Sequence, residues 1–156
     1  MAAVRSLCWD YRDFLMANSD LDRTITETFY PEDRYRTLLE GMEASHARPQ
    51  GIILLAEADG LPVGCGMSHA LDARTSEIKR VYVSPEARGA GIAAALCRAL
   101  IDQARADGFD RVVLDTSKEL AGAQRLYDSL GFARRGPYQP IPDEVVDDLV
   151  YFELAL

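Results

Sequence analysis

A glycine-bearing loop joins a strand pattern to a helix pattern near the middle of this chain. The loop runs over Ser84–Ala93 and contains Arg88, Gly89 and Gly91. Glycine lets backbone N–H groups approach a ligand closely where a Cβ would obstruct them. The N-terminus of the helix that follows carries unpaired N–H donors and about half a positive charge. The sequence therefore predicts a strand–loop–helix unit that can hold an anion such as a pyrophosphate.

The loop by itself leaves two other interpretations open. A Gly-x-Gly is also typical of a simple tight turn between a strand and a helix. Gly89–Ala94 fits the G-x-G-x-x-A fingerprint of dinucleotide-binding folds as well, with Asp115 where a ribose-binding acid stands. In that fold the glycines follow almost directly on the strand, whereas residues 84–88 intervene here. Too few strand–helix units follow Asp115 for a doubly wound sheet.

The N-terminal third is predicted to be largely helical. Apolar residues recur at three- and four-residue steps over Val4–Leu15, which predicts a first helix. Pro31 and the acidic residues after it predict the start of a second helix. Asn18–Tyr30 between them shows neither a helical nor a strand period, so we expect an irregular segment there.

The rest of the chain alternates strands and helices. Continuous apolar runs and β-branched residues predict strands, and two helices end at Gly108 and Gly131. Thr116 and Glu119 have the spacing of a capping box that starts the second of these helices. The order ααβββαβαββ predicts one α/β domain over residues 1–156, with an α+β mixed sheet and helices on both faces. The strands are predicted at Ile52–Ala56, Leu61–Ala70, Glu77–Val83, Arg111–Asp115, from Phe132 onward, and at Leu149–Leu156.

Composition excludes several classes of function. The net charge of −8 and the acidic pI argue against nucleic acid as a partner, because a phosphate backbone needs clustered Lys and Arg. No basic leader and no long apolar run is present, so neither a signal peptide nor a membrane span is predicted. Three widely spaced cysteines in apolar stretches indicate reduced core thiols and a cytoplasmic location. Two isolated histidines give no metal-ligand spacing, and no metal is predicted.

Two ordered motifs identify a family resemblance. Arg88, Gly91 and Ala93 match the Arg/Gln-x-x-Gly-x-Gly/Ala phosphate loop of the GNAT superfamily, whose members are acetyl-CoA-dependent N-acetyltransferases. Leu126–Phe132 reads Leu-Tyr-x-x-x-Gly-Phe and resembles the second motif of that superfamily, at the usual distance. The resemblance covers roughly Ile52–Leu156. The family pattern usually opens with a strand before the first helix, and no such strand is recognisable here.

The resemblance implies a GNAT-like acyl-CoA N-acyltransferase fold and acetyl-CoA as co-substrate. It implies a sheet splayed between Glu77–Val83 and Arg111–Asp115, with the pantetheine arm in the gap. A missing edge strand would leave ladder groups that a second subunit could cover, so a homodimer is possible. The residues implied to contact the cofactor are Val81, Tyr82, Val83, Arg88, Gly89, Ala90, Gly91, Ile92, Ala93, Ser117 and Tyr127.

Three groups are candidates for the chemistry. An ammonium with a pKa near 10 costs about 4 kcal/mol to deprotonate at neutral pH, so amine acetylation needs a base or a local environment that lowers that pKa. Glu77 lies eleven residues before Arg88, where one branch of the superfamily has its catalytic Glu, and it is the predicted general base, acting directly or through water. The resemblance makes Tyr127 the acid that protonates the leaving thiolate, and the backbone N–H of Val81 or its neighbour, freed by a bulge, the oxyanion donor. A Glu at the start of a strand is also commonly paired with a neighbour such as Lys79. A Tyr at this spacing on a helix is also commonly a half-buried packing residue, and this applies to Tyr127.

The sequence contains no motif that predicts where the acceptor binds. By resemblance the acceptor side is bounded by Asn18–Tyr30 and Gly136–Asp148. The second segment ends in an acidic cluster that suits a cationic amine, although such clusters are ordinarily solvated surface. We expect direct acetyl transfer to a primary amine of a small molecule or amino acid. A silent acetyl-CoA sensor, or an enzyme acting on a protein amine, is the alternative. The cluster consists of Asp143, Glu144, Asp147 and Asp148.

Overall fold

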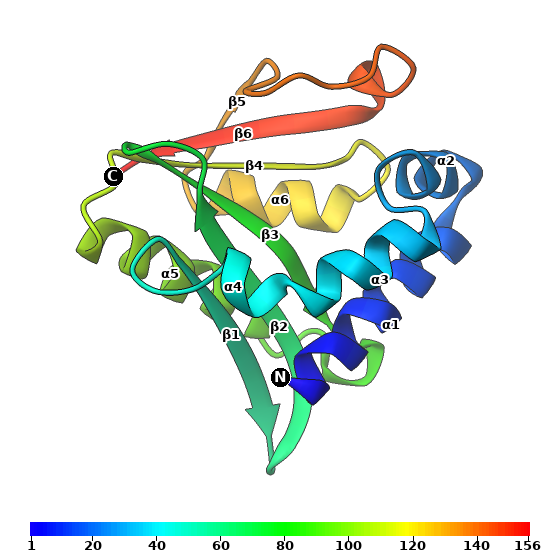
Figure 1. The fold of residues 1–156 in the computed structure, drawn as a ribbon, viewed down its shortest axis with the longest axis horizontal. Helices are drawn as coiled ribbons and strands as arrows, with labels where there is room; N and C mark the ends of the chain where they lie inside the picture. Colours follow the sequence, from blue (N-terminus) through cyan, green and yellow to red (C-terminus); the bar gives the residue numbers. More distant parts are fainter.

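Four helices precede the first strand in the computed structural model, which describes residues 1–156 (Figure 1). The prediction of an irregular Asn18–Tyr30 was wrong, because most of that segment is helix α2. Ser19 caps this helix: its Oγ accepts a hydrogen bond from the backbone N–H of Asp22 at 3.0 Å. The single helix predicted after Pro31 is divided in two at Gly41. The helices are α1 (Ala2–Asn18), α2 (Asp20–Phe29), α3 (Glu32–Glu40) and α4 (Met42–Ser45).

Six strands form one mixed sheet in the order β1-β2-β3-β4-β6-β5. Every neighbouring pair is antiparallel except β3 and β4, which are parallel and joined through α5. The predicted strands are confirmed, and Asp59 and Gly60 in the turn between the first two strands both have positive φ. The elements are β1 (Gly51–Ala58), β2 (Leu61–Ala70), β3 (Thr75–Val83), α5 (Ile92–Ala106), β4 (Arg111–Ser117), α6 (Ala121–Ser129), β5 (Ala133–Arg135) and β6 (Leu149–Ala155), with short 3₁₀ turns at Pro85–Ala87 and Val146–Asp148.

The predicted capping box at the start of α6 was wrong. Thr116 and Ser117 belong to β4, because they pair with Val150 and Leu149 of β6. The Ser117 hydroxyl instead accepts a hydrogen bond from the Glu119 backbone N–H at 3.2 Å, and this bond closes the turn between strand and helix. Helix α6 begins only at residue 121.

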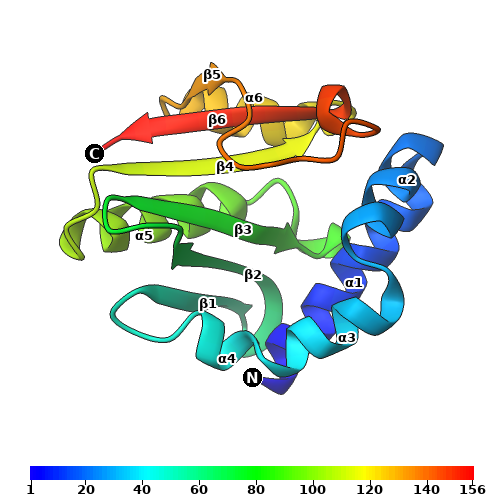
Figure 2. The same cartoon turned by 45° about the horizontal axis from the view of Figure 1, so that its top comes forward.

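Helices cover both faces of the sheet, as predicted (Figure 2). On one face, α1, α3 and α4 pack against β2 and β3 around Cys8, Leu39 and Met67. On the other face, α5 and α6 pack around Leu100 and Phe152. Each such fully buried side chain contributes roughly 1.5–3 kcal/mol. No helix of the chain combines the length and the apolar character needed to cross a bilayer.

The sheet is split between β3 and β4. The two strands pair only over Thr75–Glu77 and residues 111–113, and they diverge towards their carboxyl ends. A register shift opposite Cys65 and Met67 marks a bulge in β3, where Arg80 has a φ of 52°. A bulge bends its strand and interrupts the hydrogen-bond ladder. The splayed sheet and the bulge both agree with what the family resemblance implies.

Candidate active site

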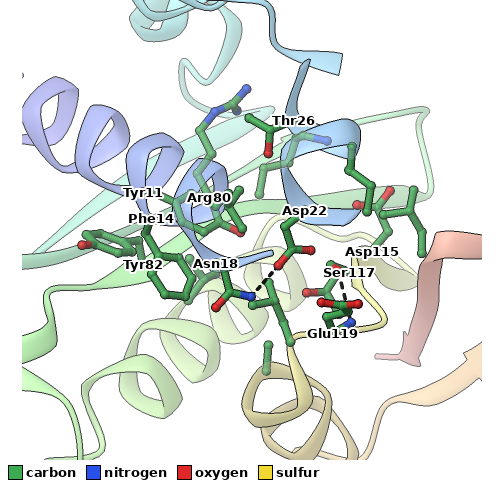
Figure 3. Close-up of a pocket in the computed structure, with 18 of the residues that line it drawn as sticks. Tyr11, Phe14, Asn18, Asp22, Thr26, Arg80, Tyr82, Asp115, Ser117 and Glu119 are labelled. Carbon is green, nitrogen blue, oxygen red and sulfur yellow. Dashed lines mark hydrogen bonds between the residues drawn. The ribbon is translucent and has the colours of Figure 1, made fainter. Parts of the chain in front are cut away.

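A cavity of about 610 Å³ lies between the diverging ends of β3 and β4 (Figure 3). Its walls come from α1, α2, the start of α5 and most of the length of α6. This volume is typical of a small-molecule or cofactor site. The split of the sheet therefore creates a binding site from elements that lie far apart in the sequence.

Arg88 and Ala93 of the predicted phosphate loop line this cavity. Gly89 and Gly91 have φ values of 83° and 76°, a left-handed conformation that glycine adopts without strain. Helix α5 starts at Ile92 without a side-chain cap, so its first N–H groups keep no partner within the helix. Arg88 fixes the loop, because its Nε donates to the Val83 carbonyl at 3.0 Å and its guanidinium stacks on Phe14 at 4.8 Å.

The predicted cofactor residues fall into two groups. One group lines the cavity: Val81, Tyr82, Val83, Arg88, Ala93, Ser117 and Tyr127. The other group, Gly89, Ala90, Gly91 and Ile92, forms the rest of the loop and the first residue of α5, outside the cavity wall. Seven of the eleven predicted residues therefore line one cavity, and their contact with a cofactor stays a prediction.

Tyr127 lies on α6 and lines the cavity with only 7% of its surface exposed. Its ring packs edge-on against Phe132 and Phe152, and its hydroxyl makes no hydrogen bond to another side chain or to the backbone. Burial raises the pKa of Tyr127 well above its ordinary value, so the hydroxyl stays protonated at neutral pH. The chain thus presents a rigidly held proton donor to the cavity.

Glu77, the predicted base, does not line this cavity and is 2% exposed. His69 Nε2 lies 2.8 Å from one of its oxygens, while the Tyr138 hydroxyl donates at 2.6 Å and Lys79 Nζ lies 3.3 Å from the other. Burial alone raises the pKa of Glu77, but His69, Lys79 and Tyr138 outweigh it and bring that pKa down to about 2. Such a carboxylate holds its neighbours in place and is a weak base.

Asp115 is a candidate that the sequence reasoning did not assign to acid–base chemistry. It lies on β4, lines the cavity, and accepts a hydrogen bond from the Tyr138 hydroxyl at 3.4 Å. Burial raises the pKa of Asp115, although the nearby charge of Lys79 acts in the opposite direction. The sequence feature that could have indicated this role is a lone carboxylate near the end of an otherwise apolar strand.

The acidic cluster predicted to meet the acceptor lies outside the cavity. Asp143 and Glu144 are exposed, and Asp148 accepts from Lys118 at 2.5 Å. The same segment instead contributes Gln139 and Ile141 to the cavity wall.

Comparison with known proteins places this geometry in a family. A family model described as "Acetyltransferase (GNAT) family" matches residues 14–132. The chain is 35% identical over 131 residues to the IAA acetyltransferase of Azospirillum brasilense, covering 78% of this chain and 85% of that protein. It is 35% identical over 109 residues to the N-acetylaspartate synthetase of Danio rerio, covering 69% of this chain but 39% of that protein.

A solved structure supports the same fold. The GNAT family acetyltransferase from Elizabethkingia anophelis, with acetyl-CoA bound, superposes with a TM-score of 0.61 at 23% identity. The superposition covers 78% of this chain and 83% of that structure. The family match spans the phosphate loop, the split in the sheet and Tyr127 alike. The chain belongs to the GNAT family of acetyltransferases.

Proposed function

We propose that this protein transfers the acetyl group of acetyl-CoA to a primary amine of a small molecule, directly within a ternary complex. The observation that carries the proposal is one continuous cavity, which runs from Arg88 past the β3 bulge and Tyr127 to Asp115 and α2. The free N–H groups at the start of α5 suit a pyrophosphate, and the gap between β3 and β4 suits the pantetheine arm. The three buried, unpaired cysteines are compatible with the proposed cytoplasmic location.

The residues around the gap include one candidate proton acceptor and one candidate proton donor. Asp115, whose pKa is raised, accepts a proton from the amine as the nitrogen attacks the thioester carbonyl. The backbone N–H of Val81, next to the bulge, stabilises the charge that develops on the carbonyl oxygen. Tyr127 then donates its proton to the sulfur as the carbon–sulfur bond breaks, leaving an amide and the free thiol of CoA. Glu77, first expected to be the base, fits better as the residue that positions Lys79 and Tyr138.

The decisive experiment couples two measurements on the purified protein. Calorimetry with acetyl-CoA reports binding, and release of the CoA thiol in the presence of a panel of amines and amino acids reports transfer. We expect binding together with amine-stimulated thiol release. Binding without any stimulated release would favour the sensor, and stimulation by protein N-termini or lysine peptides alone would favour a protein acceptor. Absence of acetyl-CoA binding would refute the proposal.

A further inference from the structure

Arg80 is a buried cation without a counter-ion from its own chain. Its side chain lines the cavity, the residue is 8% exposed, and it takes part in none of the ion pairs of the protein. Its Nε has no hydrogen-bond partner, and one terminal nitrogen donates to the sulfur of Met67, a weak acceptor, at 3.9 Å. Burying a charge is strongly unfavourable unless an opposite charge or hydrogen bonds compensate it. Arg80 is therefore a site that an anionic ligand would complete.

Two aromatic rings hold the guanidinium in place. It lies over Tyr30 at 5.4 Å and over Tyr35 at 5.9 Å. The ring faces attract a cation, but they offer no strong hydrogen-bond acceptor for its five N–H groups. The rings orient the guanidinium, and a guanidinium can bind a carboxylate through two parallel hydrogen bonds.

The backbone at Arg80 points to the same conclusion. A φ of 52° is uncommon for a residue other than glycine and costs free energy, and such residues cluster at functional sites. The next residue is Val81, the proposed oxyanion donor. The bulge therefore places a buried cation next in sequence to the residue whose N–H would meet the thioester carbonyl.

Two further residues that line this cavity carry buried polar atoms without partners. Asp22 and Thr26 are 1% and 2% exposed, and neither Asp22 Oδ1 nor Thr26 Oγ1 has a hydrogen-bond partner. Their spacing of four puts them on one face of α2, and Figure 3 shows them with Arg80 around the cavity. Asn18 holds Asp22 in place through its other oxygen, at 2.6 Å. A buried cation, a hydroxyl and a carboxylate oxygen together complement a ligand that carries both an acid and a hydrogen-bond donor.

We infer that the acceptor is an amino acid or a related amino carboxylate, whose carboxylate is bound by Arg80 and Thr26. Asp22 accepts a hydrogen bond from a donor group of the same molecule. This inference rests on the proposed function and narrows its substrate class. It disfavours an acceptor without a carboxylate, such as a polyamine, because the acidic cluster predicted to suit a cationic amine lies outside the cavity.

The first test uses the unaltered enzyme and needs no variant. Thiol release from acetyl-CoA is measured with twenty amino acids, their carboxamides and their decarboxylated amines. For the preferred acceptor we expect kcat/KM to fall by about tenfold to a thousandfold when the carboxylate is amidated or removed. Equal or better turnover of the carboxamides and amines overturns the inference while leaving the acetyltransferase proposal intact. Failure to bind acetyl-CoA overturns both.

The second test removes the cation. Arg80→Gln should raise KM for the preferred amino acid by about tenfold to a hundredfold. The ratio of kcat/KM for this amino acid to kcat/KM for its carboxamide should fall to about one. Binding of acetyl-CoA, measured by calorimetry, should stay unchanged. Arg36→Gln is the matched control, because Arg36 also lies over an aromatic ring, Trp9, but is exposed and paired with Glu32.

A third variant covers the case in which Arg80→Gln does not fold. Thr26→Val preserves the shape of the side chain and removes the hydroxyl, and we expect KM for the amino acid to rise by about tenfold, with acetyl-CoA binding unchanged. Variants that lower turnover of the acid and its carboxamide equally contradict the inference, because a merely structural role would affect both acceptors alike.

Discussion

At the scale of single residues, the clearest prediction concerns the hydroxyl of Tyr127. Tyr127→Phe keeps the packing against Phe132 and Phe152 but removes the proton donor from the cavity. We expect kcat to fall by about a hundredfold with little change in the affinity for acetyl-CoA. Tyr151→Phe is a suitable control, because that hydroxyl donates to the Val146 carbonyl outside the cavity. Unchanged turnover in Tyr127→Phe would make this tyrosine a packing residue.

Glu77 gives a residue-scale prediction about stability and pH. Its pKa falls from about 4.5 in the unfolded chain to about 2 in the fold. A lowered pKa stabilises the fold above pH 4.5, and this stabilisation is lost as the pH falls towards 2. Its magnitude is on the order of 3 kcal/mol. Glu77→Gln should lower the free energy of unfolding at neutral pH by a comparable amount, because Lys79 then loses its carboxylate partner.

Urea unfolding at several pH values separates this effect from that of other carboxylates. The stability difference between the unaltered protein and Glu77→Gln should shrink between about pH 4.5 and pH 2. Glu57→Gln is the control, since Glu57 is exposed on β1 and should show no such difference. Parallel stability curves for the unaltered protein and Glu77→Gln would contradict the assignment.

At the scale of elements, the phosphate loop makes a prediction with a built-in control. Gly60 in the β1–β2 turn and Gly91 before α5 have the same φ of 76°, and a Cβ added at either would meet no neighbouring atom. Changing either to alanine should therefore lower stability equally, by about 1–2 kcal/mol for a left-handed alanine. Only Gly91→Ala should also raise KM for acetyl-CoA, by about tenfold or more, because it tilts the N–H groups that start α5. Equal kinetics in both variants would argue against a phosphate site there.

The same scale shows which elements the sequence can predict. The strands and α5 have regular apolar patterns, and the side chains of these patterns pack into the two hydrophobic cores of the protein. Helix α2 was missed because its two buried residues are Asp22 and Thr26, which face a cavity and not a hydrophobic core. A polar stripe weakens the helical period of hydrophobicity, and the remaining signal was the Ser19 cap.

The candidate site can be predicted from the sequence only where its motifs are local. The phosphate loop and Tyr127 follow from residues close together in the sequence. The environment of Glu77 does not, because Tyr138, which donates to it, lies 61 residues away in a segment without a regular pattern. The position of Arg80 in the cavity could not be predicted, because a bulge, not the regular alternation of β3, sets the direction of its side chain.

At the scale of the whole molecule, the sheet consists of two halves with a narrow junction. β1, β2 and β3 form one half, and β4, β6 and β5 form the other; only three residue pairs join β3 to β4. The outer edge of β1 has no partner strand in the chain, so the homodimer suggested by the sequence stays a prediction that light scattering checks.

The split architecture predicts a large effect of cofactor binding on the whole fold. A ligand that fills the gap contacts both halves and binds only the folded state. At about a hundred times its dissociation constant it adds about 2.7 kcal/mol. For a chain of this size that raises the melting temperature by roughly 5–10 °C. CoA and acetyl-CoA should both produce this shift, and a nicotinamide dinucleotide should produce none, because the glycines stand too far from β3 for that motif. A shift with the dinucleotide alone would instead make Asp115 a ribose-binding acid, and the assignment of the cavity to acetyl-CoA would fail.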